Sequence, residues 1–317
     1  MKFNATQTAN WLKEQDHFLI LTHRRPDGDT LGTAAGLCAL LRKVGKTAYL
    51  FENPETTPRY LPYANIYWAP ENFVHKTLIT VDTADSAILS EGSGAVAQKI
   101  DLCIDHHASN TGYAQFTYLD TTAAACGELI VDLAVALQVD LDPEIATPLY
   151  VALTTDTGCF QYANTTGKTL FLASQLVFAG AKHVEINKSL FRTKSRGRIA
   201  LDGVLFSNLQ FFFDGKMAAC TITNALLEEC KVVEDDLDDI ATVPNLVEGV
   251  TIGAVVRELS PGFSKVSLRT APNSINASLV CQGFGGGGHP MAAGCTIAGT
   301  PQEALEKLVA AIEGQMS

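Results

Sequence analysis

Apolar runs alternate with helical patterns through the first half of the chain. Strand-like runs lie near residues 17–22, 47–51, 77–81, 101–104 and 115–119. Helical spacing of apolar residues follows at 30–43, 122–137, 143–153 and 169–178. Gly45 is a suitable C-terminal cap for the first of these helices. Strands that alternate with helices predict βαβ units, so we expect an α/β fold with a doubly wound, mostly parallel sheet and helices on both faces.

The pattern changes after residue 185. Residues 192–198 are basic and polar and contain no long apolar run, which is typical of a linker. Strand-like segments then cluster at 204–213, 217–223, 250–258 and 263–270, before a glycine-rich loop and a final helix over 302–312. We predict a first domain over 1–185, a linker over 186–203 and a smaller mixed-sheet α/β domain over 204–317. The active site is expected in the cleft between the two domains.

Acidic and imidazole side chains follow four of the apolar runs in the first half. They are His23, Asp27 and Asp29 after the first run, Asp82 after the third, Asp105, His106 and His107 after the fourth, and Asp156 after the run that ends at Leu153. In an open α/β sheet, ligands bind beyond the carboxyl ends of the strands. We therefore expect these segments to meet along one edge of the sheet.

A pair of divalent cations explains this set of side chains better than packing does. Two adjacent Mn²⁺ or Mg²⁺ ions need several terminal ligands and a carboxylate that bridges them. Imidazole and carboxylate groups without thiolate favour Mn²⁺ over Ca²⁺ or structural zinc. A local alternative is that Asp29 caps the helix near Thr30. Asp82 can also cap a helix, although Asp85 is better placed to do so.

The neighbours His106 and His107 are expected to point in opposite directions, because side chains alternate along an extended chain. One imidazole would then bind metal while the other faces the substrate. Asp105 is a candidate to orient the two imidazoles, a common duty of carboxylates beside metal-binding histidines.

Composition narrows the class of protein. The 317 residues are 47% hydrophobic, and no run reaches the roughly 18 apolar residues of a membrane span. The N-terminus lacks the apolar core of a secretory signal. Eight cysteines are scattered singly, which fits reduced thiols in a cytoplasmic protein. The net charge of −11 argues against a protein that coats long nucleic acid, but it leaves a short anionic substrate open.

Taken together, these motifs resemble the four-motif pattern of the DHH phosphoesterase superfamily. The run His23-x-x-x-Asp27-Gly28-Asp29, then Asp82, then Asp105-His106-His107, then Asp156-Thr157-Gly158 occurs in the family's order. In addition, Gly285-Gly286-Gly287-Gly288-His289 resembles the Gly-Gly-Gly-His motif of the DHH-associated domain. The length and domain order are similar to the short members, the NrnA-like oligoribonuclease/pAp phosphatase group.

The resemblance implies a role for each of these residues. One Mn²⁺ would be held by His23, Asp27 and the bridging Asp82, and a second by Asp29, Asp82, His106 and Asp156. His107 would face the substrate phosphate, and Asp105 would support the triplet. The reaction implied is hydrolysis of a phosphoester by a hydroxide that the two metals activate. Mg²⁺ or Co²⁺ are alternatives to Mn²⁺.

The C-terminal half supplies candidate substrate-binding residues. Consecutive glycines let the backbone approach an anion, and His289 and Ala292 are expected to open a helix whose N-terminus favours phosphate. A flexible hinge is the alternative for the glycines. Ser267 and Arg269 share one face of a strand and resemble the family's Ser-x-Arg-Ser element, with Thr270 in place of the last Ser. Arg257 is a further candidate. The candidate substrate-binding residues are therefore Arg257, Ser267, Arg269, Gly286, Gly287, Gly288 and His289.

The expected function is hydrolysis of short oligoribonucleotides and of 3′,5′-bisphosphorylated adenosine (pAp). The expected partner is thus a short RNA or a mononucleotide bisphosphate, with no long duplex nucleic acid and no membrane; a homodimer stays open. Two alternatives are an exopolyphosphatase-like or other small-phosphoester phosphatase, and an inactive nucleotide-binding module. The chain is too short for RecJ-type exonucleases, and the glycine motif argues against family II pyrophosphatases.

Overall fold

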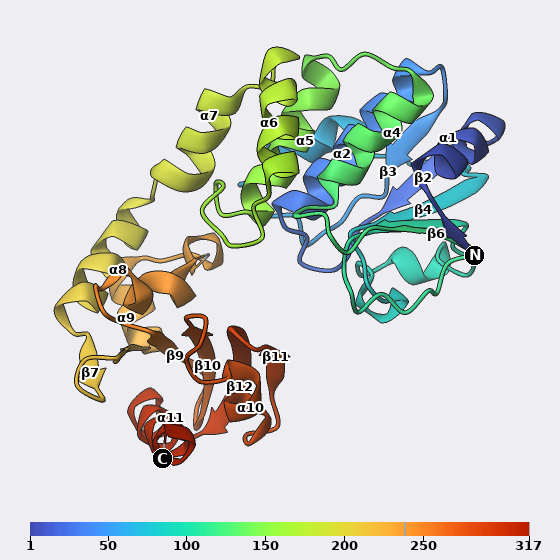
Figure 1. Cartoon of the computed structure of the whole chain (residues 1–317). Helices are drawn as coiled ribbons and strands as arrows, with labels where there is room; N and C mark the ends of the chain where they lie inside the picture. Colours follow the sequence, from blue (N-terminus) through green and yellow to red (C-terminus); the bar gives the residue numbers. More distant parts are fainter. Residues whose placement is uncertain (238, 317) are drawn as a thin grey trace. The chain divides into compact units, whose positions relative to one another are not determined.

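A computed structural model describes residues 1–237 and 239–316 of the chain (Figure 1). It divides into two compact units, Met1–Thr193 and Lys194–Ser317. The division falls inside the segment 186–203, which is largely helical: it holds the end of α7 (His183–Asn187), the π-helix η4 (Lys188–Arg192) and the start of α8 (Arg196–Ser207). Within the described residues, no helix combines the length and apolar character needed to cross a membrane.

The N-terminal unit is built on a six-stranded sheet in the order β1-β6-β5-β4-β2-β3. All neighbouring strands run parallel, as the sequence predicts. The strands are β1 (Lys2–Phe3), β2 (Phe18–Leu21), β3 (Ala48–Leu50), β4 (Thr77–Val81), β5 (Leu102–Asp105) and β6 (Phe116–Leu119). The short β1 was not predicted, because a strand of two residues leaves no pattern of alternation.

The connections between these strands contain α1 (Ala5–Glu14), α2 (Gly28–Lys43) and α3 (Leu61–Ala64). The last strand, β6, is followed by α4 (Gly127–Leu137), α5 (Pro143–Asp156) and α6 (Gly167–Phe178). Helix α2 begins at Gly28 because Asp27 caps it, accepting the Thr30 N–H at 2.9 Å, so the cap is Asp27 and not Asp29. Helix α4 begins five residues later than predicted, and the residues before it form an irregular segment.

The two faces of this sheet are covered differently. Alternate strand residues such as Ile20 and Ile104 pack into the main core with the long helices. The residues that alternate with them, such as Leu21 and Cys103, pack into a smaller cluster with Leu89 and Val96. That second face is covered by connecting segments and by the 3₁₀ helices η2 (Ser86–Ile88) and η3 (Ser93–Ala95), rather than by long α-helices.

Helices α2 and α5 are in very close contact (Figure 1). Glycines on α2 permit this contact: a Cβ on Gly32 would lie 2.4 Å from the Pro148 carbonyl oxygen and 2.8 Å from the Ala152 nitrogen. Similarly, a Cβ on Gly28 would overlap the Thr155 side chain. The pair thereby holds the first turn of α2 beside the last turn of α5, where Asp156 lies.

The C-terminal unit contains a mixed sheet in the order β11-β12-β10-β9-β8-β7. In the described part of this unit β8 and β9 run parallel, whereas the other neighbouring strands of the sheet run antiparallel, which agrees with the predicted mixed sheet. The strands are β7 (Gln210–Phe212), β8 (Met217–Ile222), β9 (Ile252–Ser260), β10 (Phe263–Thr270), β11 (Gly287–His289) and β12 (Ala292–Ala298). Helices α10 (Ala277–Gln282) and α11 (Pro301–Met316) pack on one face. Helix α8 and the 3₁₀ helix η6 (Ile240–Leu246) cover β8 and β9 on the other face.

Two predicted elements of this unit are wrong. The apolar residues near 204–207 form the end of α8, because Leu201 and Leu205 are buried at helical spacing. The residues after His289 form a β11–β12 hairpin instead of a helix. Gly287 pairs with Gly294 in that hairpin, and Pro290 lies in its turn. The glycines thus serve a tight hairpin, and the helix N-terminus expected to bind phosphate does not exist.

Candidate di-metal site

The ends of three adjacent strands bring the predicted metal-binding segments together. Strands β5, β4 and β2 are neighbours in the sheet. Asp82 directly follows β4, His106 directly follows β5, and His23 lies two residues beyond β2. The first turn of α2 adds Asp27 and Asp29, and the end of α5 adds Asp156.

Asp82 lies at the centre of the site. Its carboxylate oxygen Oδ1 is buried without a hydrogen bond, 3.3 Å from His106 Nε2 and 3.5 Å from His107 Nδ1. The other oxygen, Oδ2, accepts the Thr30 hydroxyl at 2.7 Å and lies 3.9 Å from His23 Nε2. The backbone of Asp82 has a φ of +49°, a conformation rare outside glycine and often found at functional sites. Its two oxygens therefore face two different groups of side chains.

The first group consists of His23, Asp27 and Asp82, whose donor atoms lie within 4.8 Å of one another. His23 Nδ1 donates to the Arg24 carbonyl oxygen at 2.7 Å, which turns Nε2 toward the carboxylates. The Thr30 hydroxyl lies 2.5 Å from that Nε2. Sequence reasoning missed Thr30 as a site residue, although its position three residues after the Asp27 cap could have indicated it.

The second group consists of Asp29, His106 and Asp156. His106 Nε2 lies 3.7 Å from Asp29 Oδ2 and 3.6 Å from Asp156 Oδ2. Asp29 is buried and accepts the Thr33 hydroxyl at 2.9 Å. Asp156 is about one-third exposed, so the site opens to solvent on its side.

The prediction that His106 and His107 point in opposite directions is wrong. Both imidazoles approach Asp82 Oδ1, and together with it they form a third group with donor atoms within 4.8 Å. The reason is that β5 ends at Asp105, so the alternation of an extended strand does not continue to the two histidines.

Asp105 organises this turn from a fully buried position. It accepts His107 Nδ1 at 2.8 Å, the His106 backbone N–H at 2.9 Å and Asn110 Nδ2 at 2.6 Å. Burial alone would raise the pKa of Asp105, but the hydrogen bonds from His107 and Asn110 lower it below its usual value. The bond to Asp105 in turn raises the pKa of His107. Asn110 is a second residue that sequence reasoning missed.

The carboxylates of the site repel one another. Burial, together with the charges of Asp82 and Asp156, raises the pKa of Asp29 well above its ordinary value. Burial also raises the pKa of Asp156 to about 7; His106 opposes this shift and Asp82 adds to it. Burial would lower the pKa of His106, but Asp82, whose Oδ1 lies 3.3 Å from Nε2, and the carboxylates of Asp29 and Asp156 raise it to about 10. Such crowding of buried acids is typical of sites that bind cations.

This donor set fits divalent metal ions. The three groups offer imidazole nitrogens and carboxylate oxygens without a thiolate, which suits Mn²⁺, Mg²⁺ or related ions. The buried, unbonded Oδ1 of Asp82 is an acceptor that the protein itself leaves unsatisfied, and buried acceptors of this kind need a partner.

Five of the predicted substrate-binding residues of the C-terminal unit lie on one face of its sheet: Arg257, Ser267, Arg269, Gly287 and His289. Residues paired across antiparallel strands lie on the same face. The register pairs Lys265 with Arg257, and both Ser267 and Gly287 with Gly294. It also pairs both Arg269 and His289 with Ala292.

The individual contacts of these residues differ. Arg257 forms an ion pair of 3.3 Å with Glu234, and the Arg269 guanidinium donates to the Leu268 carbonyl oxygen at 3.1 Å. A Cβ on Gly286 or Gly288 would overlap β12, whereas Gly287 faces open space. Two of the three glycines are therefore required by packing, and Gly287 is the one with room for a ligand.

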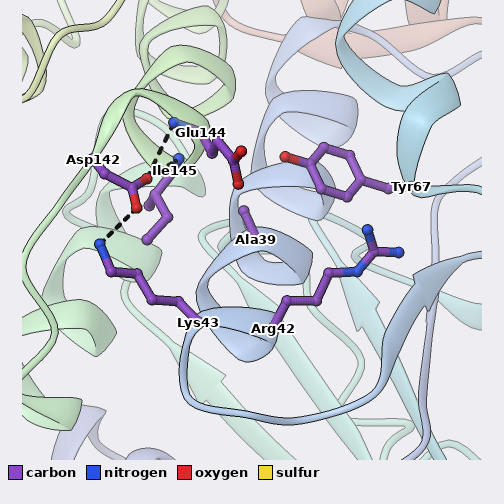
Figure 2. Close-up of a pocket in the computed structure, with 7 residues that line it drawn as sticks. All are labelled: Ala39, Arg42, Lys43, Tyr67, Asp142, Glu144 and Ile145. Carbon is purple, nitrogen blue, oxygen red and sulfur yellow. Dashed lines mark hydrogen bonds and ion pairs between the residues drawn. The ribbon is translucent and has the colours of Figure 1, made fainter.

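A pocket of about 280 Å³ lies at the opposite end of the α2–α5 pair (Figure 2). Arg42, Lys43, Tyr67 and Asp142 are among its lining residues, and none of the predicted site residues lines it. Lys43 is bound to Asp142 at 2.6 Å, as the dashed line in Figure 2 marks. The three candidate metal-binding groups therefore lie outside this pocket.

Comparison with known proteins agrees with this geometry. The model of the DHH family N-terminal domain matches residues 17–153, and that of the DHHA1 domain matches residues 216–317. A Thermus thermophilus protein named bifunctional oligoribonuclease and PAP phosphatase NrnA is 33% identical over 94% of this chain and 90% of its own length. A Bacillus subtilis protein of the same name is 26% identical over 92% and 93%.

A solved structure of an exopolyphosphatase-related protein from Bacteroides fragilis superposes with a TM-score of 0.87 at 24% identity, covering 98% of this chain and 95% of that one. It shows that the fold is shared. Family models for both domains and a relative at 33% identity over nearly the whole length establish the family itself. The chain therefore belongs to the DHH family of phosphoester hydrolases and, within it, to the NrnA-like group.

Proposed function

We propose that this protein hydrolyses phosphoester bonds in short oligoribonucleotides and in pAp, with two divalent cations, Mn²⁺ foremost, as cofactors. The observation that carries the proposal is the position of Asp82, whose two oxygens face the two ligand groups. The names of the relatives support the substrate class, since they describe oligoribonuclease and PAP phosphatase activity in proteins of similar length.

In this proposal His23, Asp27 and Asp82 hold one cation, and Asp29, Asp82, His106 and Asp156 hold the other. Two cations, when bound there, supply the positive charge that lowers the pKa of an attacking water and stabilises the phosphoryl oxygens. The protein's part is to keep the imidazoles turned toward the carboxylates. The contact of His23 Nδ1 with the Arg24 carbonyl serves this purpose.

His107 is proposed to contact the phosphoryl group undergoing hydrolysis. Asp105 holds its Nδ1 at 2.8 Å, so Nε2 is the ring atom left to donate to a phosphoryl oxygen. The imidazole is 42% exposed, which leaves it accessible to a substrate. Because Asp105 favours the charged form, His107 is suited to stabilise the negative charge that develops in the transition state.

The C-terminal residues are proposed to hold the part of the substrate that does not react. Arg269, Ser267, Gly287 and His289 form a strip on one face of the sheet, where His289 is exposed and the other three are half-buried, and a guanidinium is well suited to a phosphate. The proposal thus places the metal ligands in the predicted domain 1–185 and the substrate contacts in the predicted domain 204–317.

Time-resolved product analysis tests the proposed function. The purified protein is incubated with pAp, pGpG, a labelled pentaribonucleotide and polyphosphate, in Mn²⁺ and in Mg²⁺. We expect release of phosphate from pAp and of mononucleotides from the two oligonucleotides, faster in Mn²⁺. Hydrolysis of polyphosphate without hydrolysis of any nucleotide would instead favour a phosphatase without base recognition. Tight nucleotide binding without turnover would favour the inactive module.

A further inference from the structure

The segment that leads into helix α4, residues 123–127, contacts proposed metal ligands from two different parts of the fold. Its backbone N–H groups hold the Asp29 carboxylate: Cys126 N donates to Oδ2 at 2.6 Å and Gly127 N donates to Oδ1 at 3.1 Å. Asp29 therefore caps the N-terminus of α4 from another helix, where the helix dipole also favours a negative charge. The segment fixes both oxygens of this carboxylate.

The same segment orients His106. The Ala123 carbonyl oxygen accepts His106 Nδ1–H at 3.1 Å. This bond places the proton on Nδ1 and turns Nε2 toward Asp29, Asp82 and Asp156. Histidines that bind metals commonly donate their other ring nitrogen to such a carbonyl.

Asn164 connects the segment to Asp156. Its Nδ2 donates to the Ala124 carbonyl oxygen at 3.1 Å and to the Asp156 carbonyl oxygen at 3.0 Å. One side-chain amide thus ties the last residue of α5 to the segment that holds Asp29 and His106. All three members of the second ligand group are joined through residues 123–127.

Glu128 directly follows the segment, in the first turn of α4, and has no part in the reaction proposed above. It is 1% exposed, and its Oε1 accepts the Thr169 hydroxyl at 2.6 Å and the Ala124 N–H at 3.4 Å. Its Oε2 is buried without a hydrogen bond, 3.8 Å from Lys168 Nζ. Burying a carboxylate lowers the stability of the folded protein unless the group is paired. This one binds the backbone N–H of Ala124, whose carbonyl oxygen accepts from Asn164.

We infer that Glu128 and Asn164 are positioning residues of the second metal site. Glu128 holds the segment through the Ala124 N–H. Asn164 ties the backbone of Asp156 to the same segment through the Ala124 carbonyl oxygen. Together they set the spacing of Asp29, His106 and Asp156. This inference rests on the proposed two-metal function, since it concerns how three of the proposed ligands are held.

Calorimetric titration of the metal-free protein with Mn²⁺ tests the inference. Glu128→Gln and Asn164→Ala should each weaken one of the two Mn²⁺ sites by about 10- to 100-fold, the usual effect of losing a group behind a metal ligand, and leave the other site unchanged. In assays at rising Mn²⁺, kcat of both variants should recover toward the wild-type value. A purely structural role would not produce this recovery.

Asp132→Asn is the matched control. Asp132 lies one turn further along α4 and binds the same Lys168 at 2.9 Å, but makes no contact with residues 123–127 that the structure records. It should bind both Mn²⁺ ions like the wild type. Circular dichroism of each metal-free variant checks that it is folded. Because Asn164 lies in a connection outside the core, its variant is informative even where Glu128→Gln does not fold.

Two results would overturn the inference: wild-type affinity at both sites in Asn164→Ala, or an equal loss at one site in Asp132→Asn. A wild-type protein that binds no Mn²⁺ is a different failure, because it overturns the proposed function and removes the basis of this inference. The wild-type titration is therefore run first.

Discussion

Aspartates lie at both ends of the α2–α5 helix pair, but their pKa values shift in opposite directions. At one end Lys43 and Asp142 form an ion pair of 2.6 Å, and both side chains are about one-third exposed. At the other end Asp29 and Asp156 face His106, with Asp82 beside them. The pKa of Asp142 is lowered: burial would raise it, but the Lys43 ammonium and the backbone N–H groups of Ile145 and Glu144 together outweigh this. The pKa of Asp156 is raised to about 7, burial being the largest cause.

This difference separates a structural use of charge from a functional one. The Lys43–Asp142 pair is complete within the protein, and Figure 2 shows it among the basic and acidic residues that line a pocket. The carboxylates at the other end are crowded and partly unsatisfied, which costs stability in the metal-free protein. An arrangement that the protein does not neutralise by itself is best explained by cations from outside.

The largest effect is expected from Asp82→Asn, which removes the charge shared by the two ligand groups with little change in shape. We expect turnover of pAp to fall on the order of 1,000-fold or more, as for loss of a principal group that stabilises charge. Steady-state kinetics at saturating Mn²⁺ measures the effect. Near-normal turnover would refute the two-metal mechanism.

The second-largest effect is expected on protein stability, from a change in the packing of α2 against α5. In Gly32→Ala the added Cβ would overlap the backbone of Pro148 and Ala152, so we expect a loss of about 1–3 kcal/mol in the free energy of unfolding. Denaturant unfolding followed by circular dichroism measures it. Gly203→Ala on α8, where the Cβ meets open space, is the control and should be neutral or stabilising by up to about 1 kcal/mol. Equal stability of the two variants would contradict the close packing.

The raised pKa values predict how metal affinity depends on pH. Without metal, His106 stays protonated up to about pH 10 and Asp156 up to about pH 7, so bound cations must displace these protons. Affinity for Mn²⁺ should therefore rise with pH, about tenfold per unit for each proton released. Titrations between about pH 6 and pH 8, in buffers of different ionisation enthalpy, count the protons. Affinity that is independent of pH would show that the carboxylates do not compete with protons.

The stability of the metal-free protein should change with pH in the opposite direction to its affinity for Mn²⁺. The folded metal-free protein holds the Asp156 proton more tightly than the unfolded chain does, because the pKa of Asp156 is about 7 in the folded protein and the ordinary value for this side chain is 3.8. The contribution of Asp156 to stability is therefore present in acid and is lost as pH rises through about 7. Asp156→Asn should remove this part of the pH dependence in thermal unfolding of the metal-free protein.

The smallest effect is expected at the far end of the pair. Lys43→Met removes an exposed ion pair, so the free energy of unfolding should change by less than about 1 kcal/mol. Turnover of pAp should stay unchanged. A loss of activity comparable to that of Asp82→Asn would mean that the two ends are not distinct in function.

Much of this arrangement follows from local patterns. The parallel sheet was predictable because strands and helices alternate, and residues that follow neighbouring strands must meet at one edge. Local patterns failed where the chain leaves regular structure. His106 and His107 lie beyond the end of β5, so strand alternation gave the wrong directions. The residues after His289 form a hairpin, because Gly287 and Gly288 pair with β12.

The amino-acid sequence was sufficient to predict the kinds of ligand, their order along the chain and the family to which they point. The folded chain was needed to find which oxygen of Asp82 faces which group, that Thr30 lies between His23 and Asp82, and that residues 123–127 hold Asp29. The reason is physical: a motif specifies residues close together in sequence, whereas Asp29 and Cys126 are brought together by the packing of helices on a common sheet.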